Sequence, residues 1–327
     1  MSAPPHTRTD LLTNALERRA ALIARSDAYR LINRAGDGFP DLSVDRFAGV
    51  LVANLYSEGQ LVKPPMQLLR DLAERVEARS VYVKYRPVQA NMLDEEARRA
   101  LAPARPVIGE PAPELIASEN GLRFVIRPGE GLNPGLFLDM REMRSFVRGE
   151  AAGKTVLNCF AYTCGFGIAA LSGGAARAVN LDVSRNALEW GKRSAELNGH
   201  AINPRDFIFG DVFDWLKRFG RRSEKFDLVI LDPPSYSSTR QTRFTVERDY
   251  AALVALAAPV VAPGGWLIAC ANTHTVPTRA FLAQVRQGVS GFRARVVRTE
   301  HEPKIDFPAA PGEQPYLKIA LVRFDES

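Results

Sequence analysis

Carboxylate and amide side chains follow successive apolar runs in the second half of the chain. Such runs are typical of strands, and in a parallel sheet the carboxyl ends of strands meet at one edge, where ligands bind. A single acid at a strand end is commonly a helix cap, but a series of them favours a ligand with hydroxyl and amino groups, such as a nucleoside. The residues in these positions are Asn158, Asp182, Asp211 and Asp232.

The stretch from Asn158 to Gly167 indicates which nucleoside would bind. It reads Asn-Cys-Phe-Ala-Tyr-Thr-Cys-Gly-Phe-Gly and has two glycines, whereas a dinucleotide pyrophosphate favours G-x-G-x-x-G before a helix. Hydroxyl and aromatic side chains suit an adenosine ligand without phosphates, of which S-adenosylmethionine (SAM) is one. A dinucleotide site and an ordinary turn in a doubly wound sheet remain open from this stretch alone.

The sequence Asp232-Pro-Pro-Ser-Tyr236 is the most specific motif. Two consecutive prolines fix φ and donate no N–H, so the backbone is stiff and its carbonyls stay free as acceptors. A carboxylate, rigid carbonyls and an aromatic ring suit a planar heterocycle, such as the flipped base that base-modifying enzymes hold. The alternative is a rigid loop with Tyr236 packed on the core.

Cys270 is the candidate nucleophile, and Asn272 follows it as a candidate base contact. Methylation of a pyrimidine at C5 requires a thiolate that first adds at C6. A buried structural cysteine is the alternative reading of Cys270, and Cys159 and Cys164 are expected to be packing residues. The three cysteines match neither a disulfide framework nor a zinc motif, so no metal site is expected.

Apolar runs and helical patterns alternate from Lys154 onward, which predicts an α/β fold with a doubly wound, mostly parallel sheet. A cluster of four prolines predicts a linker, and a charged helix is expected before it over Asp94–Leu101. We therefore expect a small N-terminal α/β domain over residues 1–115 and a second domain over residues 116–327. The four prolines are Pro103, Pro106, Pro111 and Pro113.

Composition is typical of a globular protein. Among 327 residues, 46% are hydrophobic and 24% charged, and no apolar run reaches the roughly 20 residues of a membrane span. The N-terminus has no secretory signal, so a cytoplasmic location is expected. The net charge of +6 is compatible with an anionic partner such as RNA, and the oligomeric state stays open, with a homodimer as one option.

Together these motifs resemble the class I SAM-dependent methyltransferases that modify bases of bacterial large-subunit ribosomal RNA (rRNA). The resemblance begins at Tyr29 and covers most of the chain. Its carriers are Tyr29-Arg-Leu-Ile, Gly36-Asp-Gly, Val44-Asp-Arg-Phe, Gly135-Leu-Phe-Leu-Asp-Met-Arg141, Leu157-Asn-Cys-Phe-Ala-Tyr-Thr163, Gly210-Asp-Val-Phe, Asp232-Pro-Pro-Ser-Tyr and Pro315-Tyr-Leu-Lys.

The resemblance implies a Rossmann-like methyltransferase domain with SAM as its cofactor and a small N-terminal domain that holds RNA. Asp232, Tyr236, Cys270 and Asn272 would form the catalytic region. Asp139 and Arg141 would close over the methionine end of SAM. The residues expected to line the SAM pocket are Asn158, Phe160, Tyr162, Thr163, Asp182, Asp211 and Asp232.

Departures from the family leave the acceptor open between cytosine C5 and guanine N7. The cytosine branch places its cysteine at the position of Asn272, where the guanine branch has asparagine, and Cys270 lies two residues, roughly 7 Å, away. The segment from Ser237 to Arg240 also resembles the guanine branch, and Cys164 replaces the usual glycine. No room is expected for the N-terminal RNA-binding (PUA) domain of the cytosine branch. A methyltransferase for small molecules or proteins and a non-catalytic SAM- or RNA-binding module are the alternatives.

Overall fold

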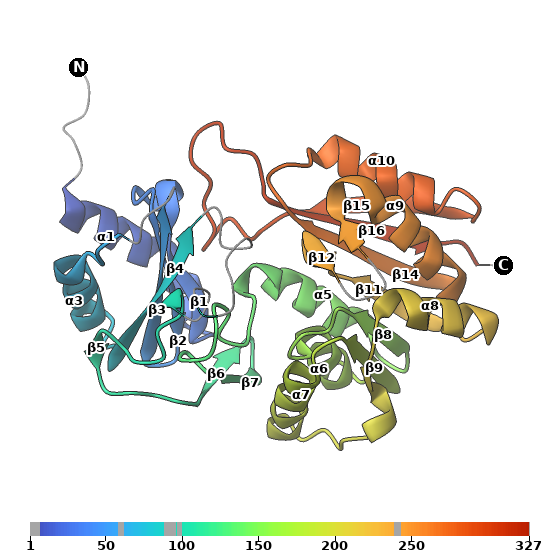
Figure 1. Ribbon diagram of the computed structural model, residues 1–327, viewed down its shortest axis with the longest axis horizontal. Coiled ribbons are helices and arrows are strands. Elements are labelled where there is room, and N and C mark those ends of the chain that lie inside the picture. Colours follow the sequence, from blue (N-terminus) through green and yellow to red (C-terminus); the bar gives the residue numbers. More distant parts are fainter. Residues whose placement is uncertain (1–6, 58–61, 88–95, 97–99, 239–242, 327) are drawn as a thin grey trace. The chain divides into compact units, whose positions relative to one another are not determined.

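The computed structural model describes residues 7–57, 62–87, 96, 100–238 and 243–326 (Figure 1). The helix expected over Asp94–Leu101 falls largely outside these residues. The chain divides into two compact units: Met1–Arg141 with Pro303–Glu313, and Glu142–Glu302 with Gln314–Ser327. The first unit therefore runs past residue 115 and takes in a segment from near the C-terminus.

The first unit is built on a sheet in the order β1-β2-β3-β4-β5, with β3 and β4 parallel and the other neighbours antiparallel. Alternate side chains of the central strands form an apolar core with α1 and α3 on one face. The strands are β1 (Ala28–Asn33), β2 (Leu42–Phe47), β3 (Val50–Ser57), β4 (Ser80–Pro87) and β5 (Ile108–Gly109), and the helices are α1 (Arg8–Arg18), α2 (Ala20–Ile23) and α3 (Met66–Arg75).

A hairpin of β6 (Leu115–Glu119) and β7 (Leu122–Ile126) also belongs to the first unit. Its turn residues Asn120 and Gly121 have φ of 48° and 80°, the left-handed pair that an Asn-Gly hairpin turn requires. The hairpin is tied to the start of β1, where the Ser26 hydroxyl accepts from the Asn120 N–H at 3.0 Å. This long-range pairing is why the unit extends beyond the proline-rich segment.

The second unit contains a sheet in the order β10-β9-β8-β11-β14-β16-β15. The first five strands are parallel, and β16 runs antiparallel to its neighbours β14 and β15, so the expected mostly parallel, doubly wound sheet is confirmed. The strands are β8 (Thr155–Cys159), β9 (Arg177–Asp182), β10 (Phe207–Phe209), β11 (Phe226–Leu231), β14 (Val261–Asn272), β15 (Ala294–Glu300) and β16 (Leu317–Phe324), and β12 (Tyr236–Ser238) pairs with β13 (Arg243–Thr245) beside them.

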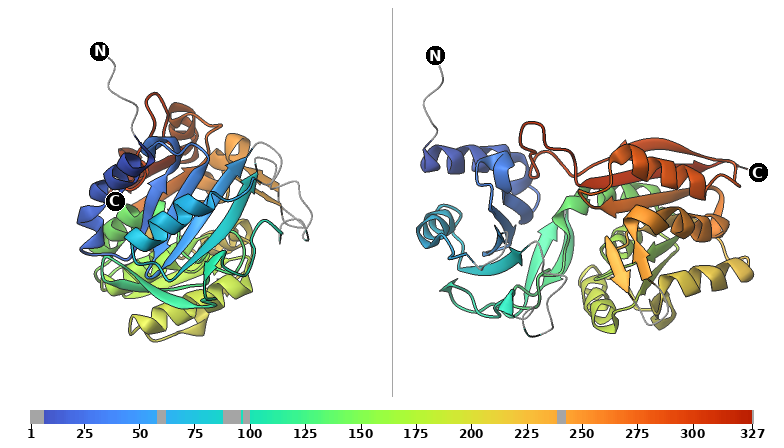
Figure 2. Two further views of the ribbon diagram at one scale, coloured as in Figure 1. Left: turned by 90° about the vertical axis from the view of Figure 1, so that its left-hand side faces the viewer. Right: turned by 45° about the horizontal axis from the view of Figure 1, so that its top comes forward.

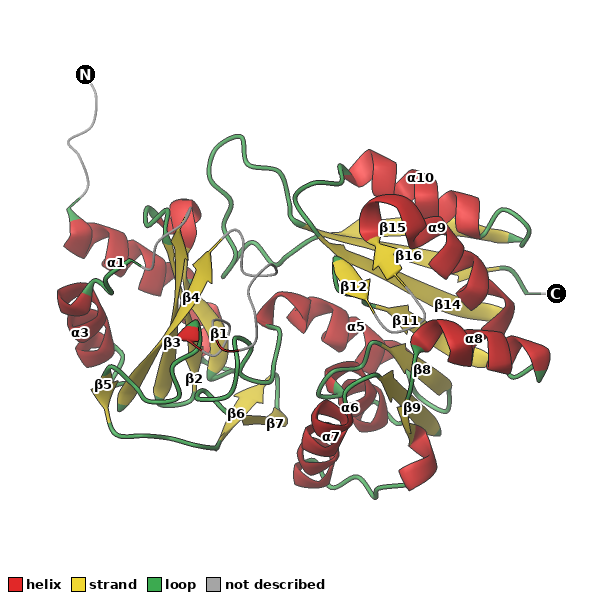
Figure 3. Cartoon of the chain, in the orientation of Figure 1, coloured by secondary structure: helices red, strands yellow, loops and turns green. Residues whose placement is uncertain are grey.

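Helices cover both faces of this sheet (Figures 2 and 3). One face shares a core with α8 (Val212–Arg221), α9 (Val246–Ala257) and α10 (Thr278–Gly288). The other is covered by α5 (Arg141–Glu150), α6 (Gly165–Ser172) and α7 (Arg185–Leu197). The strand order reverses beside β8, since β9 lies on one side and β11 on the other. In such sheets a ligand binds at this reversal, beyond the carboxyl ends of the strands.

Candidate cofactor and acceptor site

The parallel register brings the polar residues singled out in the sequence to one edge of the second unit's sheet. Asn158 of β8 pairs with Asn180 of β9, two residues before Asp182 ends that strand. Asp211 follows β10, Asp232 follows β11, and Asn272 ends β14. These five side chains therefore stand at successive strand ends on both sides of the reversal.

The loop after β8 has an unusual backbone. Phe160, Tyr162 and Cys164 have φ of 59°, 48° and 62°, a region that costs a non-glycine residue about 1–2 kcal/mol. Such strain persists only where surrounding structure enforces it, and it concentrates at ligand sites. The left-handed conformation of Cys164 also explains why glycine suits that position in the family.

Asp182 holds this loop in place. Its Oδ2 accepts from the Tyr162 N–H at 2.8 Å, and its Oδ1 accepts from the Ser184 N–H at 2.7 Å. Burial raises the pKa of Asp182, and these backbone donors oppose that rise. A carboxylate has about four acceptor positions, and the N–H groups of Tyr162, Ser184 and Val183 act on this one, so capacity remains for a ribose hydroxyl.

The side-chain oxygen of Asn158 accepts no hydrogen bond within the protein. Its side chain is buried, its Nδ2 donates to Asn180 Oδ1 at 2.9 Å, and its Oδ1 has no hydrogen-bond partner. Buried polar atoms are almost always paired, so an orphan at the strand reversal fits an N–H donor from a ligand. The acceptor oxygens of Asn158 and Asp182 thus suit the amino and hydroxyl groups of SAM better than a pyrophosphate, which itself only accepts.

We expect Gly167→Ala to disturb this corner. A Cβ at Gly167 would lie 2.2 Å from Asn180 Oδ1, so the Asn158–Asn180 pair must move. The free energy of unfolding should fall by about 1–3 kcal/mol, as in overpacked cores, and SAM affinity should fall with it. Urea unfolding followed by tryptophan fluorescence measures the first effect, because Trp190, Trp215 and Trp266 all lie in the second unit. The matched control is Gly220→Ala in α8, where a Cβ meets nothing within 4 Å; an equal loss there would contradict the account.

The remaining pocket residues have structural partners as well. Asp211 is the N-cap of α8, and its Oδ1 accepts from the Phe213 N–H at 2.8 Å, so the helix-cap reading is correct for that oxygen. Phe160 packs edge-on against Phe213, with ring centroids 6.4 Å apart. Tyr162 lies 6.2 Å from the ring of Trp190, and Thr163 is buried. These contacts tie the loop to α7 and α8.

The Asp232-Pro-Pro-Ser-Tyr236 segment is held against the end of β14. The Ser235 hydroxyl donates to the carbonyl of Asn272, and the Ser235 carbonyl accepts from the Val246 N–H at 3.2 Å. Tyr236 is 55% exposed, so the alternative that it packs on the core is wrong. An exposed ring on a stiff loop beside Asn272 is a surface on which a base can stack. Thr239 and Arg240, which resemble the guanine branch, lie outside the described residues.

All three cysteines of the chain are fully buried. Burial raises the pKa of the Cys159 thiol and, with the nearby Asp182, that of Cys164. Cys270 lies within β14, where its carbonyl accepts from the Tyr250 hydroxyl at 2.7 Å. The exposed residue at the strand end is Asn272. The structure therefore places an amide, not a thiol, at the open edge.

Asp139 and Arg141 lie in the first unit, so their closure over the methionine end of SAM stays a prediction. Arg141 is fully buried, and its Nη1 and Nη2 donate to the two carboxylate oxygens of Asp306 at 2.8 and 2.6 Å. Sequence reasoning missed Asp306, because nothing local marks a partner 165 positions away. This pair fixes the start of α5, directly after Asp139.

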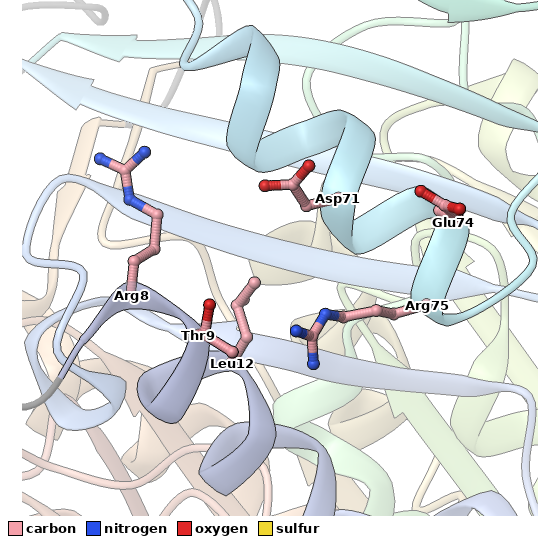
Figure 4. A pocket seen from close by; sticks show the side chains of 6 residues that line it. All are labelled: Arg8, Thr9, Leu12, Asp71, Glu74 and Arg75. Atoms are coloured by element: carbon pink, nitrogen blue, oxygen red, sulfur yellow. The ribbon is translucent and has the colours of Figure 1, made fainter.

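A pocket of about 450 Å³ lies elsewhere, between α1 and α3 of the first unit (Figure 4). Its lining holds two arginines and two carboxylates, so its charges balance and favour no ligand. Among the described residues no group of histidine, cysteine and acidic side chains could hold a metal ion. None of the helices in the described ranges is long and apolar enough to cross a membrane. The pocket residues are Arg8, Thr9, Leu12, Asp71, Glu74 and Arg75.

The fold and the strand-end site define a Rossmann-like protein of the nucleoside-binding class. Residues 29–317 match the family model described as "S-adenosylmethionine-dependent methyltransferase". The chain belongs to that family, and it is an enzyme whose cofactor is SAM. The class and cofactor expected from the motifs are therefore confirmed.

Curated relatives and solved structures agree with this assignment. The chain is 34% identical over 325 residues to a "Ribosomal RNA large subunit methyltransferase" of Deinococcus radiodurans, covering 96% of this chain and 78% of the relative. It is 35% identical over 261 residues to "Ribosomal RNA large subunit methyltransferase I" of Aeromonas salmonicida, covering 79% of this chain and 64% of the relative. A crystal structure of "a putative methyltransferase complexed with SAH" superposes with a TM-score of 0.83 at 25% identity, covering 98% of this chain and 83% of that one.

Proposed function

We propose that this protein transfers the methyl group of SAM to a base of large-subunit rRNA. The observation that carries the proposal is the exposed Tyr236 on the stiff Asp-Pro-Pro loop, next to the open end of β14. The names of the relatives support an rRNA substrate, and the net charge of +6 is compatible with one. A cytoplasmic location, where ribosomes assemble, follows from the same proposal.

The chain's residues would act mainly by positioning. Bound SAM supplies an electrophilic methyl group on a sulfonium, and in-line transfer needs the acceptor atom held against that methyl. Asp182 and the loop after β8 would hold the nucleoside part of the cofactor. Tyr236 would stack on the flipped base. Asp232 and the carbonyls of Pro233 and Pro234 would accept hydrogen bonds from the edge of that base. Asn272 would contact the same base from the end of β14.

Guanine N7 fits this site better than cytosine C5. The N7 lone pair can attack a methyl group directly, and no proton has to leave. Cytosine C5 needs a thiolate at C6, but Cys270 is fully buried and Asn272 occupies the exposed position. We therefore propose guanine N7 as the acceptor, with cytosine C5 as the second candidate.

Cys270→Ala tests this choice. We expect the variant to retain methyl transfer within about twofold of wild type, because the thiol does not reach the acceptor edge. The measurement is the initial rate with labelled SAM and rRNA. Asn272→Ala is the comparison, and it should slow transfer while Cys270→Ala does not. Complete loss of activity in a folded Cys270→Ala protein would instead assign the thiol to cytosine chemistry.

The substrate class is tested with extracts of cells that lack the gene. Labelled SAM and the purified protein should put label into material that RNase destroys. Protease-sensitive label would indicate a protein methyltransferase, and label in small molecules would indicate a small-molecule enzyme. SAM binding without turnover on any fraction would indicate a non-catalytic module.

A further inference from the structure

One face of the first unit's sheet carries polar residues where the opposite face carries the apolar core. On β3 and β4, Leu51, Ala53, Val81 and Val83 belong to the core. The residues between them point to the other face, because side chains alternate along a strand. We call the set on that face the polar cluster: Arg30, Asp45, Asn54, Lys84 and Arg86.

Hydrogen bonds link four members of the polar cluster across the sheet. Arg30 Nε and Nη2 donate to the Asp45 carboxylate at 2.7 and 3.1 Å. Asn54 Nδ2 also donates to that carboxylate, at 3.2 Å, and Asn54 Oδ1 accepts from Arg86 Nε at 3.0 Å. Outside the cluster, Arg86 Nη2 donates to the Leu132 carbonyl at 2.8 Å and to Asn133 Oδ1 at 3.2 Å, so this guanidinium is held by neighbouring acceptors.

Lys84 is the member that this network leaves out. It lies opposite Asn54 in the parallel register, is fully buried, and its Nζ has no hydrogen-bond partner. The side-chain oxygen of Asn54 already accepts a hydrogen bond from Arg86. The Lys84 Nζ lies 6.0 Å from the ring centroid of Tyr82, which is at the limit of a cation–π contact. Burial and then the charge of Arg86 lower the pKa of Lys84 to about 8. An ammonium group without a partner in such a place is costly unless an anion joins it.

We propose that the polar cluster is an oxyanion site in which Lys84 binds a backbone phosphate of the RNA substrate. The inference rests on the proposed function and adds a contact point in the first unit. Exposure rises along β4, from buried Lys84 to half-buried Arg86, so the site opens toward the end of that strand. A phosphate there would give the Lys84 ammonium its missing acceptor, and the four-carbon stem lets the ammonium turn toward it.

The test compares Lys84→Met with Lys63→Met, which removes an exposed lysine from the same unit. Methionine keeps most of the stem and removes the charge. Binding of deproteinised large-subunit rRNA is measured between about 50 and 200 mM salt, together with SAM affinity and the urea midpoint of the first unit, which is followed by hydrogen exchange of β3 and β4 peptides. For Lys84→Met we expect about tenfold weaker RNA binding and a salt slope lower in magnitude by roughly 0.7–0.9, the contribution of one phosphate. SAM affinity should not change.

The stability of Lys84→Met distinguishes a role of Lys84 in phosphate binding from a role in holding the fold together. Because the ammonium has no partner in the free protein, Lys84→Met should unfold at the same or a higher urea concentration than wild type. A clear drop in the urea midpoint, or an unchanged RNA salt slope, would overturn the oxyanion site. If the salt slope is unchanged but the wild-type protein still methylates rRNA, the oxyanion site is rejected and the proposed function stands. If the wild-type protein does not bind rRNA at all, the oxyanion site and the proposed function are both rejected.

Discussion

Asp232→Ala is expected to lower kcat for methyl transfer by about 10²–10³-fold while the protein stays folded. Asp232 stands at the strand reversal, directly before the stiff Pro-Pro turn and beside the exposed Tyr236. Loss of its carboxylate would remove the group that we propose holds the edge of the acceptor base, and misplacement of about 1 Å costs roughly 10²-fold in an in-line reaction. Initial rates with saturating SAM and rRNA measure the effect.

The matched control is Glu189→Gln, which alters an exposed acid on α7 of the same unit. It should leave kcat unchanged. Because the fall expected for Asp232→Ala is in kcat, raising the RNA concentration should not restore the rate. If the rate of Asp232→Ala recovers fully at high RNA concentration, Asp232 contributes only to RNA binding. If the variant has near-normal activity at all RNA concentrations, Asp232 does not belong to the catalytic site.

Asp306→Ala is expected to produce the largest loss of stability, about 3–5 kcal/mol in the first unit. Asp306 and Arg141 are both fully buried and joined by two hydrogen bonds, so the change removes the carboxylate that accepts both bonds from a buried guanidinium. The backbone N–H of Arg30 also loses its acceptor at 3.2 Å. No tryptophan lies in the first unit, so hydrogen exchange of peptides from β1 to β3 is the suitable measurement.

Protection of those peptides should fall by about 10²- to 4 × 10³-fold, which is the same free energy expressed as an equilibrium. Asp325→Asn serves as the control, since its pair with Arg295 is exposed and should contribute less than about 1 kcal/mol. Unchanged protection in Asp306→Ala would mean that the buried pair does not hold the segment Pro303–Glu313 to the first unit.

Much of the second unit could be predicted from the sequence, because its signals are local. Apolar runs that end in Asp182 and Asp232 mark parallel strands, and the strand order then places both acids at one edge. The stiffness of Pro233-Pro234 likewise follows from residue type alone. The exposure of Tyr236 is less local, since it depends on how β12 pairs with β13.

The rest depends on contacts between distant positions. Asp306 could not be identified as the partner of Arg141, and the segment around it could not be assigned to the first unit. The burial of Cys270 is set by Ile319 of β16, its antiparallel partner, and by the helices on the sheet. Lys84 carries no sequence signal, because an isolated lysine in a strand normally lies on a solvated face.

The central claim is that the strand-end site methylates a base of rRNA, and nucleoside mass spectrometry tests it most directly. Large-subunit rRNA from a strain lacking the gene is incubated with the protein and isotopically labelled SAM, digested to nucleosides and analysed. We predict label in 7-methylguanosine, formed about 10²–10³-fold more slowly with Asp232→Ala and within about twofold of the wild-type rate with Cys270→Ala. Label in 5-methylcytidine would keep the enzyme class and reverse the choice of base, whereas label in neither nucleoside would contradict the account.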